Sequence, residues 1–363
     1  MKLFILALCL LFGSFIFSTI LTALVRRFSL KSGFVARPAA DRYHQSVIPL
    51  GGGIAISWTI IIFLLAAAGI VKFLMVPGYL DFLGERITVH AKGFVDNIGS
   101  LMIVIGCVLV LHLVGLWDDK KSPGAMVKLF FQFAVAAAAA GFANIRVELF
   151  IENTLITTAL SVFWIVLIMN SFNFLDNMDG LSAGIAVIAV SVLFFAAASS
   201  GQLFVGALSL IFIGALLGFL VFNFPPARIF MGDCGSLVIG FLVGLLTLRT
   251  TYYNEVQSGG AYAVFIPLVV MAVPLYDFIS VTIIRLSQGR SPFVGDTQHF
   301  SHRMKRRGLT DTQTALTLYL ATLCTGIGAI FLFQVNLAGA ILVFLQTLMI
   351  LFIIAIMEVT GKS

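Results

Sequence analysis

The sequence contains very little charge. Only 10 % of its 363 residues are Asp, Glu, Lys or Arg, against about a quarter in soluble globular proteins, while 60 % are hydrophobic. No segment is long and polar enough to form an appended soluble domain, so we treat residues 1–363 as a single domain. These absences argue against a soluble protein, and we expect no nucleic-acid partner. They predict an all-α protein that crosses a lipid bilayer many times.

Cysteine motifs and internal repeats are also missing. Cys9, Cys107, Cys234 and Cys324 are far apart and form no Cys-x-x-Cys pair, so neither a zinc site nor a dithiol redox site is indicated. The absence of an internal repeat disfavours a transporter built from inverted halves. The first apolar run is longer than the core of a signal peptide and lacks a small-residue cleavage site, so we expect a retained span.

Long apolar runs define the predicted topology, because about 20 apolar residues are needed to cross roughly 30 Å of hydrocarbon. They predict about eleven transmembrane helices, or ten if one run tilts or breaks. The runs cover residues 3–25, 50–76, 98–117, 125–143, 154–172, 181–199, 203–223, 235–250, 261–285, 314–333 and 337–357.

Basic residues orient this topology. With eleven spans, the segments on one face carry 16 of the 22 Lys and Arg residues, so the positive-inside rule makes that face cytoplasmic. Every segment with polar residues suited to chemistry falls on the same face: residues 37–53, 115–128, 170–184, 223–236 and 289–308. This convergence predicts one composite site at the cytoplasmic surface.

The stretch from Asn170 to Gly180 is the most unusual of these segments, because it places several amides and carboxylates between two apolar runs. On a helix, Asn170, Asn173 and Asn177 lie on one stripe, whereas Asp179 lies opposite. The helix is therefore expected to unwind before Gly180, and the polar residues of its last turn are expected to form part of a site. The alternative is an ordinary polar loop between helices.

Two other segments carry carboxylates at predicted helix ends. Asp118 and Asp119 precede a Pro-Gly turn, and Lys128 lies one turn into the next helix. Asp233 lies between Gly232 and Gly235. Paired carboxylates suit Mg²⁺ that also binds phosphate and water, and a nearby lysine suits the remaining phosphate charge. Considered alone, each segment is also compatible with a simple surface turn.

The remaining two segments are basic. Gly51 to Gly53 open the second span beside His44, and their backbone N–H groups are candidates for contacting an anion; a Gly-rich turn with a basic anchor is the alternative. His299 and His302 are spaced to share a helical face and are candidate donors to a pyrophosphate. Lys305 to Arg307 form a cluster attracted to anionic lipid headgroups.

Together these motifs provide what phosphoryl transfer at a membrane surface requires. Their order also resembles the polyprenyl-phosphate N-acetylhexosamine-1-phosphate transferases, multi-span bacterial membrane enzymes that move a sugar-1-phosphate from a UDP-sugar to undecaprenyl phosphate and release UMP. The resemblance spans residues 37–308. It implies Mg²⁺, with Mn²⁺ as a substitute, the lipid bilayer of the bacterial cytoplasmic (inner) membrane as the setting, and leaves a homodimer open.

The resemblance also implies roles for individual residues. Asp118 and Asp119 match the aspartate pair that binds the metal or acts on the lipid phosphate, and Asp233 matches the magnesium-binding aspartate. Catalytic roles are further implied for four residues of the Asn/Asp and His motifs: Asp176, Asp179, His299 and His302. Substrate-binding roles are implied for Lys128, Asn170, Asn173, Asn223, Arg303 and His44.

The sequence departs from the family pattern at two places, and the first of them bears on the branch. His299-Phe300-Ser301-His302 lacks three consecutive histidines, which favours the N-acetylglucosaminyl branch over phospho-N-acetylmuramoyl-pentapeptide transferase, although Ser301 replaces a usual histidine. No third acidic residue follows Asp119 before Ser122. The muramoyl-pentapeptide transferase and a non-catalytic lipid or solute carrier stay as alternatives.

Overall fold

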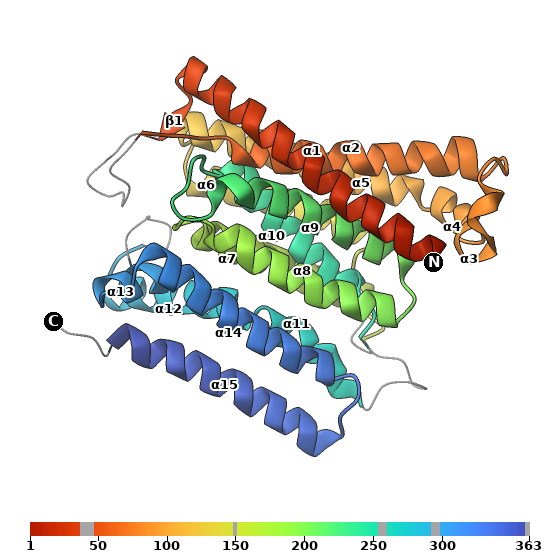
Figure 1. Ribbon diagram of the computed structural model, residues 1–363. Coiled ribbons are helices and arrows are strands. Elements are labelled where there is room, and N and C mark those ends of the chain that lie inside the picture. Colours follow the sequence, from red (N-terminus) through yellow and green to blue (C-terminus); the bar gives the residue numbers. More distant parts are fainter. Residues whose placement is uncertain (37–46, 148–150, 253–259, 292–297, 360–363) are drawn as a thin grey trace.

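A bundle of long helices makes up almost the whole computed structural model, which describes residues 1–36, 47–147, 151–252, 260–291 and 298–359 (Figure 1). The α-helices are α1 (Lys2–Ser32), α2 (Gly52–Ile70), α3 (Glu85–Thr88), α4 (Ala91–Asp96), α5 (Ile98–Lys121), α6 (Ala125–Phe142), α7 (Thr154–Leu175), α8 (Leu181–Ser199), α9 (Leu203–Asn223), α10 (Asp233–Arg249), α11 (Ile266–Val270), α12 (Ala272–Ser287), α13 (Phe300–Arg306), α14 (Asp311–Phe331) and α15 (Leu337–Val359). A π-helical turn, Val71–Met75, extends α2, and 3-10 turns cover Asp81–Leu83 and Ala261–Phe265.

Each of the eleven predicted apolar runs contains helix. Nine helices of the described residues are long and apolar enough to cross a membrane, and the pair Tyr262–Val270 and Ala272–Ser287, bent by 65°, makes a tenth span if counted as one. The 17-residue α10 occupies the remaining run. The prediction of an all-α, multi-span membrane protein is therefore confirmed.

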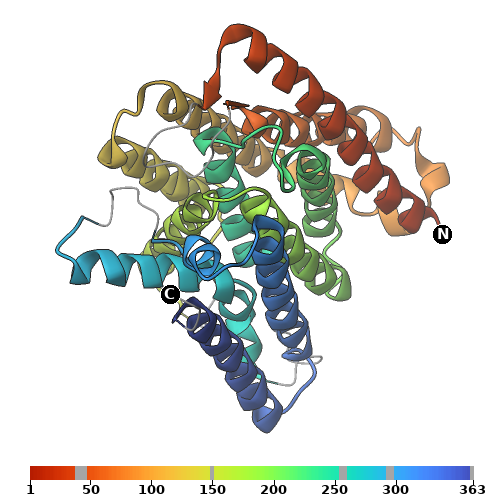
Figure 2. The same cartoon turned by 60° about the vertical axis from the view of Figure 1, so that its left-hand side comes forward.

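The two termini of the chain lie at opposite ends of the helix bundle. In Figure 1, α1 begins at the right-hand end, beside α3 and α4, and α15 ends at the left-hand end, beside α13. This is the arrangement expected for an odd number of crossings. Turned by 60°, the bundle shows the blue helices α14 and α15 along one side and α12 projecting outward from them (Figure 2).

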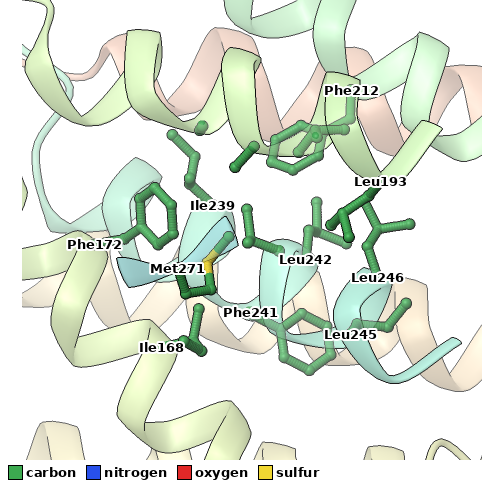
Figure 3. Close-up of a cluster of buried hydrophobic side chains, with 14 of the residues drawn as sticks. Ile168, Phe172, Leu193, Phe212, Ile239, Phe241, Leu242, Leu245, Leu246 and Met271 are labelled. Atoms are coloured by element: carbon green, nitrogen blue, oxygen red, sulfur yellow. The ribbon is translucent and has the colours of Figure 1, made fainter. Parts of the chain in front are cut away.

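Helix α10 forms the centre of the core. Every residue from Cys234 to Thr247 is buried, because α2, α5, α7, α8 and α9 all pack around this helix. Figure 3 shows its side chains Ile239, Phe241 and Leu242 meeting those of α7, α8 and α9. A helix that is apolar on every side must be surrounded by protein or lipid, and here protein surrounds it.

At the left-hand end of the bundle, a glycine cap and a pair of short strands reverse the chain between α1 and α2. Gly33 takes a left-handed conformation (φ 74°) and ends α1. Strand β1 (Val35–Ala36) then pairs antiparallel with β2 (Ile48–Pro49), which brings α2 back into the bundle beside α1. Residues 37–46, and with them His44, lie outside the described residues.

Candidate active site

The predicted site residues that the structure describes lie on or next to helix ends, at the left-hand end of the bundle (Figure 1). Asp118 and Asp119 are in the last turn of α5, Lys128 is in the first turn of α6, and Asp233 is the first residue of α10. The unwinding of α7 after Leu175 matches the predicted break before Gly180. Motifs that are far apart in the sequence thus meet at one end of the molecule.

Lys128 links two of the carboxylates. Its Nζ lies 3.2 Å from Asp118 Oδ2 and also contacts Asp233 Oδ2. All three side chains are about four-fifths buried. One ammonium group between two carboxylates leaves a net negative charge when both are ionised, so the cluster attracts a further cation.

Asp119 faces the backbone of α10 instead. Its Oδ1 accepts a hydrogen bond from the Asp233 N–H at 2.8 Å, and its Oδ2 accepts one from Cys234 at 3.3 Å. Negative charge at this position stabilises the N-terminus of a helix. The sequence did not predict this contact, which fixes the position of Asp233; a role of Asp119 as a magnesium ligand stays a prediction.

The two asparagines of α7 lie at different depths in the helix bundle. Asn173 donates to Asp233 Oδ1 at 3.0 Å and to Ser236 Oγ at 2.9 Å, and so touches the carboxylate cluster. Asn170, one turn deeper, donates to Gln132 Oε1 at 2.7 Å. Gln132 was missed by the sequence analysis, although a single buried amide one turn after Lys128 in an apolar run is the signal that could have identified it.

Two loops beside the cluster are joined by side-chain hydrogen bonds. Asn223 accepts from the Gly180 N–H at 3.0 Å and donates to the Ile229 carbonyl at 2.9 Å, while Asp179 accepts from the Ala227 N–H at 2.8 Å. These contacts hold the segment after α7 against the segment before α10. Asp176 lies in the first of these loops, where burial raises its pKa well above the usual range, and the negative charges of Asp233 and Asp119 raise it further.

The glycines that open α2 serve packing. The N–H groups of Gly52 and Gly53 donate to the carbonyls of Phe230 and Met231 at 2.9 and 3.0 Å, so the interpretation of these groups as anion ligands is wrong. A Cβ on Gly53 would lie 2.2 Å from the backbone nitrogen of Gly235. The glycines let α2 touch the backbone at the start of α10.

The two histidines are positioned by α13. His299 directly precedes this helix, and its Nδ1 lies 2.8 Å from Asp277 Oδ2 on α12, while Asp277 Oδ1 accepts from the Phe300 N–H at 2.9 Å. Asp277 is completely buried and was also missed from the sequence, although it is a lone carboxylate in an apolar run. It orients the imidazole ring of His299 through Nδ1.

His302 differs from His299 in its electrostatic surroundings. Burial lowers its pKa to about 4, and the neighbouring His299 and Lys305 contribute to the shift. The side chain is therefore uncharged at neutral pH and would offer a phosphate an N–H donor rather than a positive charge. The neighbouring Ser301 is buried and donates to Asn177 Oδ1, which connects α13 to the Asn170–Gly180 stretch.

The donor set fits a magnesium ion. Among the described residues, no three His, Cys, Asp or Glu side chains form a group that could hold a metal by themselves. Mg²⁺ typically uses one or two carboxylates and takes its other ligands from water and substrate phosphates. Asp118 and Asp233, which converge on the Lys128 ammonium group, match that requirement and are the residues that would hold the ion.

Known proteins resemble the chain over almost its whole length. The sequence pattern of glycosyl transferase family 4 matches residues 101–251. A Bacillus subtilis protein described as a probable undecaprenyl-phosphate N-acetylglucosaminyl 1-phosphate transferase is 31% identical over 350 residues, which are 94% of this chain and 88% of that protein. The chain belongs to the polyprenyl-phosphate N-acetylhexosamine-1-phosphate transferase family. The resemblance inferred from the motifs is thereby confirmed.

More distant relatives agree with this membership. The undecaprenyl-phosphate alpha-N-acetylglucosaminyl 1-phosphate transferase of Escherichia coli O157:H7 is 27% identical over 86% of this chain and 80% of its own length. The decaprenyl-phosphate N-acetylglucosaminephosphotransferase of Mycobacterium tuberculosis H37Rv is 28% identical over 82% of this chain and 76% of its own length. The family resemblance thus extends to relatives named for two different polyprenyl phosphates.

The contact between Asp277 and His299 leads to a first prediction. Asp277→Asn removes a charge-assisted hydrogen bond worth about 1.5–3 kcal/mol, so we expect transferase activity to fall about 10- to 100-fold. In a His299→Gln background the same substitution should cost almost nothing further, because the ring that Asp277 orients is gone. Initial rates of the four proteins in this double-mutant cycle test the idea. Equal, additive losses in both backgrounds would mean that Asp277 does not act through His299.

Proposed function

We propose that this protein transfers N-acetylglucosamine-1-phosphate from UDP-N-acetylglucosamine, or a related UDP-N-acetylhexosamine, to undecaprenyl phosphate in the presence of Mg²⁺. An oxygen of the lipid phosphate bonds to the β-phosphorus of the UDP-sugar, and the bond from that phosphorus to the bridging oxygen breaks, which releases UMP. The product is a lipid-pyrophosphate-linked sugar of the kind that begins a cell-envelope glycan. The observation that carries the proposal is the Asp118–Lys128–Asp233 cluster on a chain of this family.

The residues of the cluster have separable tasks in this reaction. Asp118 and Asp233 would hold a magnesium ion, which would neutralise pyrophosphate charge when bound. Lys128 attracts the remaining phosphate charge, while Asn173 keeps the Asp233 carboxylate in place through its 3.0 Å hydrogen bond. His299 and His302 donate hydrogen bonds to the phosphates of the nucleotide sugar. A direct transfer and a transfer through an aspartyl intermediate are both compatible with this placement.

The distribution of basic residues supports a location for the reaction. The 16 basic residues on the face that carries the site support the cytoplasmic side of the bacterial cytoplasmic membrane as its location. There the site has access both to a water-soluble nucleotide sugar and to a lipid phosphate in the adjacent leaflet.

The proposal predicts UMP release that requires both substrates and a divalent cation. Detergent-purified protein is given undecaprenyl phosphate and a panel of UDP-sugars that includes UDP-muramoyl-pentapeptide, first with Mg²⁺, then with excess chelator, and then with Mg²⁺ restored. We expect lipid-dependent release with UDP-N-acetylglucosamine that stops on chelation and returns with Mg²⁺. Preference for the muramoyl substrate would favour the other branch, and no release by folded protein would favour the carrier.

A further inference from the structure

A buried ion pair joins the histidine-bearing helix to α15. Glu358, near the end of α15, accepts hydrogen bonds through Oε2 from Arg303 Nε at 3.1 Å and from Arg303 Nη2 at 2.9 Å. The two side chains are only 8% and 11% exposed. Arg307 strengthens the connection, because its Nε donates to the Glu358 carbonyl at 3.1 Å.

The other donors of Arg303 are also directed at protein groups. Nη2 donates to Ser280 Oγ on α12 at 3.0 Å, and Nη1 donates to the carbonyl of Gln298. A guanidinium group has five N–H donors in a rigid plane, and here all three of its nitrogens are engaged. Arg303 therefore bridges α12, α13 and α15 in this structure, in contrast to the direct substrate contact implied by the sequence resemblance.

The short helix α13 needs such an anchor. It has seven residues, and helices of this length are not stable without tertiary contacts. Arg303 directly follows His302 in that helix, so a tilt or rotation of the Arg303 backbone moves both histidines. Tyr276 of α12 also donates to Glu358 Oε2, at 3.3 Å, which makes the carboxylate the point where α12, α13 and α15 meet.

We propose that Glu358 is a positioning residue that sets the orientation of His299 and His302 through Arg303. The inference rests on the proposed function, because its readout is turnover of the UDP-sugar. A positioning role affects the substrate that the histidines contact. The KM for undecaprenyl phosphate should therefore stay close to the wild-type value while kcat/KM for the UDP-sugar falls.

Glu358→Gln tests this role with little change in shape. The substitution keeps one amide oxygen as an acceptor but removes the charge, and we expect kcat/KM for the UDP-sugar to fall about tenfold, as for other residues that orient a site residue. Asp311→Asn is the matched control, since it breaks the ion pair between Lys305 of α13 and Asp311 at the start of α14 without touching Glu358. Rates are expressed per folded protein, measured by thermal unfolding. Wild-type kinetics in folded Glu358→Gln would overturn the proposal.

A charge exchange separates positioning from direct substrate contact. Arg303→Glu and Glu358→Arg should each reduce kcat/KM for the UDP-sugar, and combining them should recover about tenfold of the loss, since the ion pair is restored with its charges reversed. A folded double variant as inactive as Arg303→Glu would show that Arg303 acts on substrate directly. An inactive wild-type protein would instead count against the proposed function, so the two failures are distinguishable.

Discussion

Asp233→Asn is expected to reduce transferase turnover by about three orders of magnitude, because the proposed magnesium site would lose one of its two carboxylate charges. The amide has the same shape as the carboxylate and can keep the contact with Asn173. Lys128 would lose one of its two carboxylate partners, but the fold around α10 would stay intact. UMP release at saturating substrate, measured beside the thermal unfolding midpoint in detergent, tests the expectation.

Asp96→Asn is the control for this experiment. Asp96 is exposed on α4 at the opposite end of the bundle, so its substitution changes the net charge by the same amount without touching the cluster. Asp118→Asn should resemble Asp233→Asn. Near-normal turnover in both Asp118→Asn and Asp233→Asn would contradict the assignment of the site.

Gly115→Ala is expected to be strongly destabilising. A Cβ at this position of α5 would lie 2.4 Å from both the Cα and the N of Cys234, so the backbone of α10 would have to move. Overpacking of cores commonly costs 1–3 kcal/mol, and a clash with backbone atoms lies at or above the top of that range, at about 3 kcal/mol. We expect a large drop in the unfolding midpoint and in the yield of monodisperse protein.

Gly106→Ala on the same helix provides the comparison. Nothing lies within 4 Å of the position that its Cβ would occupy, and the residue is exposed. Alanine is about 1 kcal/mol more favourable than glycine within a helix, so this variant should be at least as stable as the wild type. If both variants unfold at the wild-type temperature, the close approach of α5 and α10 does not contribute to stability.

Much of the fold could be predicted because hydropathy is a property of consecutive residues. Each apolar run corresponds to helix, and the break after Leu175 follows from the clustering of amides and carboxylates in the Asn170–Gly180 stretch. The meeting of the motifs at one end could also be predicted, since the number of spans determines the end at which each loop lies. Counting spans gave no information on which helix lies at the centre, and only the structure places α10 there.

The unpredicted features depend on contacts between residues far apart in the sequence. Asp277 and Gln132 lie within apolar runs, so the mean hydropathy of each run hides their polarity. Only the packing of α12 against α13 and of α6 against α7 shows which residues they hydrogen-bond to. Gly53 is the opposite case, because the sequence suggested a chemical role for a residue that serves packing. A glycine beside a basic segment suggests an anion site, whereas its missing side chain here makes room for Gly235.

The Glu358 contacts also have a consequence for the order in which the protein is made. Ribosomal synthesis proceeds from the N-terminus, and regions that are complete can fold before later ones are made. Helices α5, α6, α7 and α10, which bring Asp118, Lys128 and Asp233 together, all precede α15 by many residues. The acidic half of the site can therefore assemble early during membrane insertion, while α13 gains its anchor only after α15 has entered the bilayer. A nascent chain would hold the Asp118–Lys128–Asp233 cluster before its histidines were positioned, which would delay activity until insertion is nearly finished.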